Sequence, residues 1–177
     1  AGEIIDVCGT GGDRLHTFNV STMVGFVVAA SGMAVAKHGN RAITSRCGSA
    51  DVLGALGIRI DLPPVQAANW LEQHRFAFLF APLYHPAFQP IAPARRLCAN
   101  RGQRTVFNLL GPLLNPARPT AQLVGVPQPP WGDPLARVLQ SLGVRRAMVV
   151  SGRVDAPPGS SPDEAQWLDE LSTLGES

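Results

Sequence analysis

The sequence predicts an α/β fold in which a mostly parallel sheet is flanked by helices. Short apolar, partly β-branched runs alternate with helix-like segments, which is the pattern of βαβ units. Clusters of polar residues follow three of these runs, at the end of a parallel sheet where ligands bind. With 177 residues, of which 45% are hydrophobic, the chain can enclose one sizeable core. We therefore expect a single domain over residues 1–177.

The expected elements alternate along the chain. Strands are predicted at residues 4–7, 34–37, 77–80, 122–126 and 147–150. The first helix is expected near residues 21–31, with Asn19 or Ser21 as its cap and Gly32 as its end. Further helices are expected over residues 49–57, 64–74, where Pro64 suits the first turn, and 133–142, which ends before Gly143.

The remaining segments have weaker patterns. Residues 87–100 are expected to be helical after their prolines, and residues 105–110 are ambiguous between strand and helix. Residues 154–162 are rich in proline, glycine and serine and lack an apolar period, which predicts a solvent-exposed loop.

Composition excludes several classes of protein. The formal net charge is +2, and Lys37 is the only lysine, so no long basic run is present to follow a nucleic-acid backbone. Cys8, Cys47 and Cys98 form neither an even set nor a CxxC pair, which favours a reducing cytoplasm over a disulfide framework. The longest apolar stretch, residues 23–30, is too short to span a bilayer. We expect a cytoplasmic protein without nucleic-acid or membrane partners.

The strongest local pattern is the glycine loop, Gly9-Thr10-Gly11-Gly12-Asp13, which follows the first strand. Its three glycines free the backbone to approach a ligand and to direct successive N–H groups at one anion. The helix start at residues 19–22 comes next, where unpaired N–H groups and the helix dipole favour phosphate. A tight turn followed by an ordinary capped helix explains the same residues, and the spacing matches neither the Rossmann nor the Walker motif.

Two polar clusters follow the second and third strands. Residues 37–41 combine a lysine, a histidine, a glycine and an amide, and with Thr44, Ser45 and Ser49 they suit a phosphate- or substrate-facing loop, although such a run is more often a solvated loop. His85 and Arg95, taken alone, are typical of structural or surface positions.

Near the end of the chain, the adjacent carboxylates of Asp169 and Glu170 suit Mg²⁺, which prefers oxygen ligands. Adjacent acids are also common on protein surfaces.

Seven motifs occur in one order: Gly-Thr-Gly-Gly-Asp, Asn-x-Ser-Thr, Lys-His-Gly-Asn-Arg, Gly-Ser-Ala-Asp, Tyr-His-Pro, Phe-Asn-Leu-Leu-Gly-Pro-Leu-Leu-Asn-Pro and Asp-Glu. By this combination the chain resembles the anthranilate phosphoribosyltransferase family from its first residues to its last. The resemblance implies a catalytic domain of the nucleoside phosphorylase/phosphoribosyltransferase type. It also implies transfer of a phosphoribosyl group from phosphoribosyl pyrophosphate to anthranilate in tryptophan biosynthesis, with release of pyrophosphate.

The resemblance also implies the site residues and the cofactor Mg²⁺. Phosphoribosyl pyrophosphate would be bound by Gly9, Gly12, Asp13, Thr17, Asn19, Val20, Ser21, Thr22, Lys37, His38, Gly39, Asn40, Arg41, Ala42, Ile43, Thr44, Ser45 and Ser49. Anthranilate would be contacted by Gly9, His38, Asn40, His85 and Arg95, whose guanidinium suits its carboxylate. Magnesium would be held by Ser21, Asp169 and Glu170.

The chain departs from the family pattern at several places. Arg14 stands where the family usually has glycine, Cys47 where serine is common, and the segment 154–162 is longer than usual. Family members also carry an N-terminal helical domain and further elements after the acidic pair, so we expect a fragment of a longer, homodimeric enzyme with an incomplete sheet.

Two other hypotheses remain open from the sequence. One is a related phosphoribosyltransferase or nucleoside phosphorylase with another substrate. The other is a non-catalytic paralogue that binds phosphate or nucleic acid.

Overall fold

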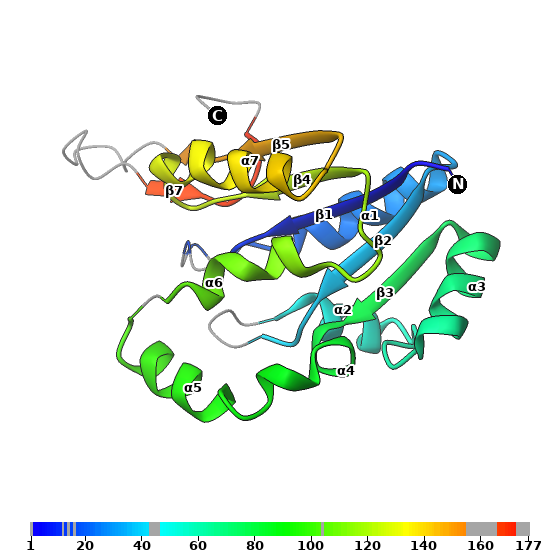
Figure 1. Cartoon of the computed structure of the whole chain (residues 1–177), viewed down its shortest axis with the longest axis horizontal. Helices are drawn as coiled ribbons and strands as arrows, with labels where there is room; N and C mark the ends of the chain where they lie inside the picture. The colour runs from blue at the N-terminus through cyan, green and yellow to red at the C-terminus, as the bar shows by residue number, and fades with distance from the viewer. Residues whose placement is uncertain are drawn as a thin grey trace.

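The chain folds around a five-stranded parallel sheet, as seen in a computed structural model that describes residues 2–11, 13, 15, 17–42, 47–103, 105–154 and 166–172 (Figure 1). The strand order is β3-β2-β1-β4-β5, and every neighbouring pair is parallel. The bounds are β1 Ile4–Gly9, β2 Ala34–Gly39, β3 Phe76–Phe80, β4 Ala121–Gly125 and β5 Arg146–Val150. Two short strands, β6 (Gly152–Val154) and β7 (Gln166–Leu168), form a separate antiparallel pair.

Helices cover both faces of the main sheet. On one face lie α1 (Val20–Ala30) and α2 (Ser49–Ala55), and on the other lie α3 (Pro64–His74) and α7 (Gly132–Ser141) (Figure 1). Shorter elements connect them: α4 Ala81–Tyr84, η1 Pro86–Phe88, α5 Ala92–Asn100, α6 Phe107–Leu110, η2 Gly111–Leu114 and η3 Pro129–Trp131. No helix within the described part of the chain is long and apolar enough to cross a lipid bilayer.

The predicted α/β fold is confirmed, with five strands and four main helices close to the expected bounds. Asn19 caps α1, because its side-chain oxygen accepts a hydrogen bond from the Thr22 N–H at 3.2 Å. Gly32, Gly57 and Gly143 follow helix ends with positive φ angles, which glycine adopts without strain.

The structure resolves the ambiguity at residues 105–110 and corrects the prediction for Val154. The ambiguous segment 105–110 contains the short helix α6. Val154, expected to begin a loop, instead ends β6, whose pairing with β7 supplies its backbone hydrogen bonds. The rest of that expected loop lies outside the described residues.

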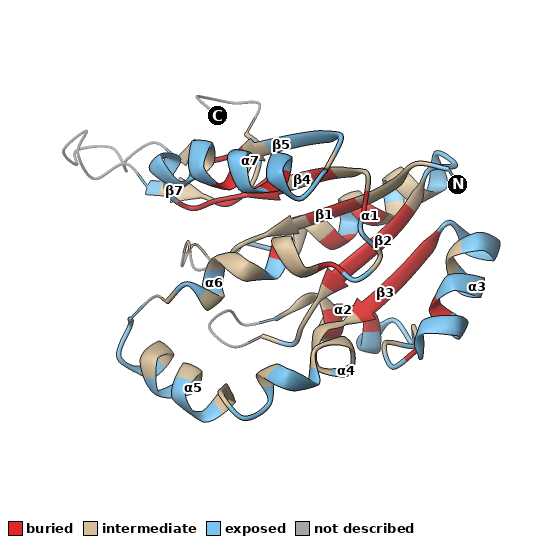
Figure 2. Ribbon diagram, in the orientation of Figure 1, coloured by how far each residue is buried: buried red, intermediate tan, exposed pale blue. Residues whose placement is uncertain are grey.

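The alternation of side chains along the strands divides the core between the two faces. Val35, Phe76 and Phe78 pack with α1 and α2, whereas Ala36 and Leu79 pack with α3. A third cluster joins β4 to α7 through Val124 and Leu139. Figure 2 shows the buried residues concentrated along β2, β3 and β4, with exposed residues on the outer sides of α3 and α7. Burial of both faces is the physical basis of a parallel sheet.

Several polar side chains are buried within this apolar framework, among them Asp6, Lys37 and Asn115. Asp6 accepts hydrogen bonds from the His38 N–H at 3.3 Å and from the Asn115 amide at 2.8 Å. The same Asn115 amide group donates to the Ala36 carbonyl at 2.8 Å. Lys37 donates to the Val7 carbonyl at 2.6 Å and to Ser21 Oγ at 2.9 Å. Burial raises the pKa of Asp6 and lowers the pKa of Lys37, while the attraction between the two groups opposes both shifts.

We predict that Asn115→Ala lowers the free energy of unfolding by about 2 to 3 kcal/mol, because the buried Asp6 carboxylate and Ala36 carbonyl both lose a donor. Chemical denaturation of the wild type and the variant measures this difference. Asn69→Ala, at an exposed position of α3, is the control and should change the free energy by no more than about 0.5 kcal/mol. Equal effects of the two substitutions would contradict the role given to Asn115.

Candidate functional site

Two adjoining cavities open at the carboxyl ends of β1 and β2, with volumes of about 340 and 250 Å³. We call the larger one the aromatic cavity and the smaller one the polar cavity. The wall between them is formed by residues common to both linings: Cys8, Gly9, Gly11, His38, Gly39, Asn40 and Gly48. The two cavities therefore adjoin beside the ends of β1 and β2.

The polar cavity combines the glycine loop with the start of α1. Its lining includes Asp13, Thr17, Asn19 and Ser21 from these segments, and Lys37 from β2. Gly11 has φ 73°, a left-handed conformation that favours glycine, which turns the loop at the end of β1. The Thr10 N–H donates to the Gly125 carbonyl at 2.9 Å, which ties the loop to the end of β4.

The acidic pair also lies in the polar cavity. Asp169 and Glu170 line it, and Asp169 Oδ2 accepts a hydrogen bond from the Gly11 N–H at 2.6 Å. Burial is the main cause that raises the pKa of Asp169 to about 6 and that of Glu170 to about 7. Asp13 raises both values further, whereas the Gly11 N–H lowers that of Asp169 and Lys37 lowers that of Glu170. The two carboxylates are thus crowded by negative charge.

The donors in the polar cavity suit a hard cation that keeps part of its hydration shell. Within the described residues, no three His, Cys, Asp or Glu side chains form a group able to chelate a metal by themselves. Mg²⁺ commonly binds through one or two carboxylates together with water and phosphate oxygens. Asp169, Glu170 and the Ser21 hydroxyl provide such an oxygen-only set beside the glycine loop.

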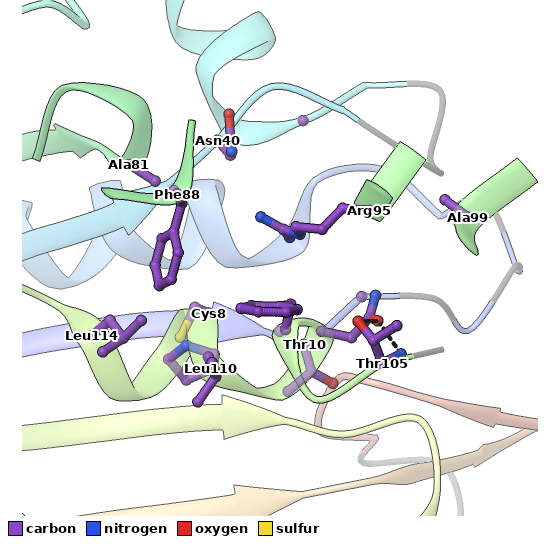
Figure 3. A pocket seen from close by; sticks show the side chains of 18 of the residues that line it. Cys8, Thr10, Asn40, Ala81, Phe88, Arg95, Ala99, Thr105, Leu110 and Leu114 are labelled. Carbon is purple, nitrogen blue, oxygen red and sulfur yellow. Dashed lines mark hydrogen bonds between the residues drawn. The ribbon is translucent and has the colours of Figure 1, made fainter. Parts of the chain in front are cut away.

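The aromatic cavity is lined by two arginines, Arg41 and Arg95, among polar, apolar and aromatic side chains. The Arg95 side chain extends from α5 into this cavity, which Phe88 also lines (Figure 3). The Arg95 guanidinium carbon lies 5.6 Å from the centre of the Phe107 ring, and the Phe88 and Phe107 rings meet edge to face at 5.9 Å. This lining suits a flat aromatic ligand that carries a carboxylate.

A pair of histidines lies in the wall of the aromatic cavity. His38 Nδ1 lies 3.1 Å from the Gly111 carbonyl, and its Nε2 lies 3.2 Å from His85 Nε2. Because a carbonyl only accepts, His38 Nδ1 carries the proton, and His85 Nε2 donates to His38. Burial lowers the pKa of His38 to about 4, against the effect of the Gly111 hydrogen bond, so His38 is neutral at pH 7.

The loop after β2 is held by Asp51 at the start of α2. Asp51 accepts hydrogen bonds from the Ala42 N–H and the Gly48 N–H, each at 2.9 Å, and pairs with Arg41 at 3.0 Å. These donors keep the pKa of the Asp51 carboxyl below its usual value, the two backbone N–H groups being the main cause. The Arg41 side chain is therefore directed to Asp51.

The structure brings most of the predicted site residues together. The polar cavity is lined by Gly9, Asp13, Thr17, Asn19, Val20, Ser21, Lys37, His38, Gly39, Asn40, Ser49, Asp169 and Glu170, and the aromatic cavity by Gly9, His38, Gly39, Asn40, Arg41, Ala42, His85 and Arg95. Thr22 lines neither, because it is fully buried in the first turn of α1. Gly12, Ile43, Thr44 and Ser45 lie outside the described residues, as does Arg14.

Sequence reasoning misses several lining residues. Phe107, Asn108 and Gly111 belong to a motif to which the sequence alone assigns no role. Thr10 is predicted only as part of the glycine loop, yet its hydroxyl is buried in the cavity wall without a hydrogen-bond partner among the described residues. Phe88 and Cys98 have no local pattern that could identify them.

Comparison with known proteins agrees with this geometry. The model of the glycosyl transferase family, a/b domain, matches residues 1–157. The chain is 54% identical over 150 residues to an anthranilate phosphoribosyltransferase from Persephonella marina, covering 85% of this chain and 43% of that protein. It is 52% identical over 169 residues to the one from Ignicoccus hospitalis, covering 94% and 49%. The chain thus spans about half the length of the curated relatives it matches.

Solved structures give the same result. The anthranilate phosphoribosyltransferase of Thermus thermophilus superposes with a TM-score of 0.76 at 46% identity, covering 96% of this chain and 46% of that one. The enzyme from Saccharomyces cerevisiae, solved in complex with PRPP and Mg, has a TM-score of 0.80 at 30% identity, covering 98% and 45%.

We predict that divalent-cation affinity falls as the pH is lowered from about 8 to about 5.5, because protons compete for Asp169 and Glu170, with pKa values of about 6 and about 7. Calorimetry with Mg²⁺ in buffers of different ionisation enthalpy measures affinity and proton release together. Affinity independent of pH would contradict this assignment.

The raised pKa values of Asp169 and Glu170 also determine how the stability of the folded chain changes with pH. Both pKa values lie above the usual ones, which are 3.8 for aspartate and 4.5 for glutamate. The folded chain therefore holds more protons than the unfolded chain between about pH 4 and 7. The contribution of these groups to the free energy of unfolding therefore falls as the pH rises through that window without cation. Glu170→Gln is the control, and it should remove the part of this pH dependence of the unfolding free energy that arises near pH 7.

Proposed function

The chain belongs to the glycosyl transferase family, a/b domain, and we propose that it takes part in transferring a phosphoribosyl group from phosphoribosyl pyrophosphate to anthranilate. The observation that carries this proposal is the pair of adjoining cavities with opposite chemistry. One has N–H groups, hydroxyls and carboxylates for a metal-bound pyrophosphate. The other has aromatic rings and a guanidinium for an aromatic carboxylate. The two cavities share lining residues at the ends of β1 and β2.

Phosphoribosyl pyrophosphate is placed in the polar cavity. The start of α1 favours its phosphates, the glycine loop lines the same cavity, and Asn19, Ser21 and Lys37 add polar side chains. Because Lys37 is buried and already donates to Val7 and Ser21, its role is to hold Ser21 in place and to add positive charge beneath the phosphates.

Magnesium is the cofactor that the donor set supports. Asp169, Glu170 and Ser21 are its proposed protein ligands, as a hard cation prefers oxygen. When bound, the cation supplies neutralisation of the negative charge on the leaving pyrophosphate.

Anthranilate is placed in the aromatic cavity. Arg95 would pair with its carboxylate, with the guanidinium already held against the Phe107 ring. Phe88 and Phe107 would contact the ring of the ligand. Asn40, which lines both cavities, would lie beside the anthranilate amine, and the His38–His85 pair would form the adjacent wall.

In the proposed reaction the amine nitrogen of anthranilate forms a bond to the anomeric carbon of the ribose, while the bond from that carbon to the pyrophosphate oxygen breaks. The electron pair leaves with pyrophosphate, and the amine loses a proton as the new bond forms. The described residues contribute by positioning the two substrates and by placing N–H donors where charge grows. None of the described groups needs to act as a strong base, since the amine proton becomes acidic during bond formation.

We also propose that residues 1–177 form one phosphoribosyl-pyrophosphate-binding domain of a longer, homodimeric enzyme in the cytoplasm. Support comes from the relatives, of which the chain spans about half, and from three cysteines that are free of disulfides. No nucleic-acid or membrane partner is proposed.

The direct test is an assay of the full-length protein with phosphoribosyl pyrophosphate, magnesium and anthranilate, followed by loss of anthranilate fluorescence. Turnover supports the proposal. Inactivity alongside a working reference enzyme would refute it, and phosphorolysis of a nucleoside would instead identify the related activity.

We predict that Arg95→Ala raises the KM for anthranilate about 10- to 100-fold, the effect of losing one charged hydrogen bond, and changes the KM for phosphoribosyl pyrophosphate much less. Arg96→Ala, at the exposed neighbouring position on α5, is the matched control and should leave both constants unchanged. Steady-state kinetics with each substrate varied measures both. Equal rises in the two constants would contradict the placement of anthranilate beside Arg95.

A further inference from the structure

Two glycines form a gap in the carboxyl edge of the sheet, and Asp169 lies in it. Gly9 ends β1 and Gly125 ends β4, and the two are paired across the strands. We call this pair the glycine notch. The acidic segment from Leu168 to Ser172 passes over it, with Asp169 in contact with both glycines.

The contact leaves no space for a side chain at either glycine. A Cβ atom on Gly125 would overlap the carbonyl group of Asp169 and lie 3.1 Å from its Cα. A Cβ on Gly9 would overlap Oδ2 of Asp169 and lie 2.9 Å from its Cγ. The conflict at Gly125 is with main-chain atoms, so a change of rotamer cannot relieve it.

Backbone conformation does not account for the glycine at position 125. Positive φ angles occur at Gly11, Gly32 and three other glycines, but at neither member of the notch. Glycine within a strand lowers stability, and it often marks a place where another backbone approaches closely. Close approach of Asp169 is the feature that requires a bare backbone here.

Further contacts hold the same segment. Asp169 Oδ2 accepts the hydrogen bond from Gly11 N–H at 2.6 Å. Gly152 pairs with Leu168 in the β6–β7 sheet, and a Cβ on Gly152 would lie 2.8 Å from the Glu170 carbonyl oxygen. The main chain on either side of the carboxylates is therefore set by close backbone contacts from β1, β4 and β6.

We propose that Gly125 is a positioning residue for the cation-binding carboxylates: by lacking a side chain, it allows Asp169 and Glu170 to lie over the carboxyl end of the sheet. This inference rests on the cation role in the proposed function. A methyl group at position 125 would push the Asp169 main chain out to ordinary carbon contact, about 3.5 to 4.0 Å, and would shift both carboxylates relative to Ser21.

The test compares Gly125→Ala with Gly132→Ala in the full-length protein. Gly132, at the start of α7, has open space around a Cβ and a negative φ, so it is the matched control. Mn²⁺ binding without substrates is measured by electron paramagnetic resonance. Exchange of the Gly11 amide hydrogen, which is bonded to Asp169, is measured by NMR.

We expect Gly125→Ala to weaken Mn²⁺ binding about 10- to 100-fold, as loss of supporting contacts around metal ligands commonly does. The Gly11 amide should exchange faster, while amides within β1 and β4 stay protected. Gly132→Ala should match the wild type in both measurements. In the assay, Gly125→Ala should need more Mg²⁺ for half-maximal rate, a change that a general loss of folded protein would not produce.

Wild-type Mn²⁺ affinity in a folded Gly125→Ala protein would overturn the notch proposal and leave the proposed function standing. A wild-type protein that binds no Mn²⁺ would overturn both. If Gly125→Ala does not fold, Gly152→Ala displaces the Glu170 main chain from outside both cavities, and unchanged Mn²⁺ affinity in that variant would also overturn the proposal.

Discussion

The buried ammonium of Lys37 is the interaction on which the arrangement of the site depends. It donates to the Val7 carbonyl of β1 and to Ser21 Oγ in the first turn of α1, so one side chain of β2 joins both elements that flank the glycine loop. Gly25 eases the packing of α1 on the sheet, because a Cβ there would lie 3.3 Å from the Phe76 ring, which is a tight contact. On the opposite face of the sheet, the carboxylate of Asp6 fixes the main chain at His38. The register of β1 and β2 at their carboxyl ends is thereby set by buried polar contacts, in which a single mispairing is costly.

That register explains why two cavities share one wall. The end of β2 and Asn40, which follows it, lie between the glycine loop on one side and the segment from α4 to η2 on the other, so Asn40 lines both spaces. The motif that contains Gly111 and Asn115 supports the ends of β1 and β2 through two hydrogen-bonding groups. Its Gly111 carbonyl fixes the tautomer of His38, and its Asn115 amide satisfies Asp6. A reaction between an aromatic amine and a phosphorylated sugar needs such a meeting point, because reactants held in contact avoid most of the entropic cost of encounter.

The sequence predicted the strands and main helices because β-branched runs, caps and glycine ends gave consistent local patterns, as at Asn19 and Gly143. It could not predict β6 and β7, since three residues are too few to show a period. Asp6 and Asn115 were missed because a polar residue in a strand or a loop gives no indication that its partner is distant in sequence. The same reason limited the prediction for Asp169. Its proximity to the glycine loop depends on Gly9 and Gly125, and nothing local to residues 166–172 indicates that contact.

The charges in the polar cavity favour a site in which cation and phosphate bind together. Among its described lining residues, the carboxylates of Asp13, Asp169 and Glu170 face one ammonium, that of Lys37, and His38 is neutral. A pyrophosphate entering alone would bring further negative charge to a region where burial already raises the pKa values of two acids. A divalent cation reverses that balance, because it removes the repulsion among the acids and then attracts the phosphate oxygens. The N–H groups at the start of α1 can orient a phosphate, but they carry only partial charges. If the proposed function holds, tight binding of pyrophosphate at this edge of the sheet requires the acidic segment to be seated with its cation.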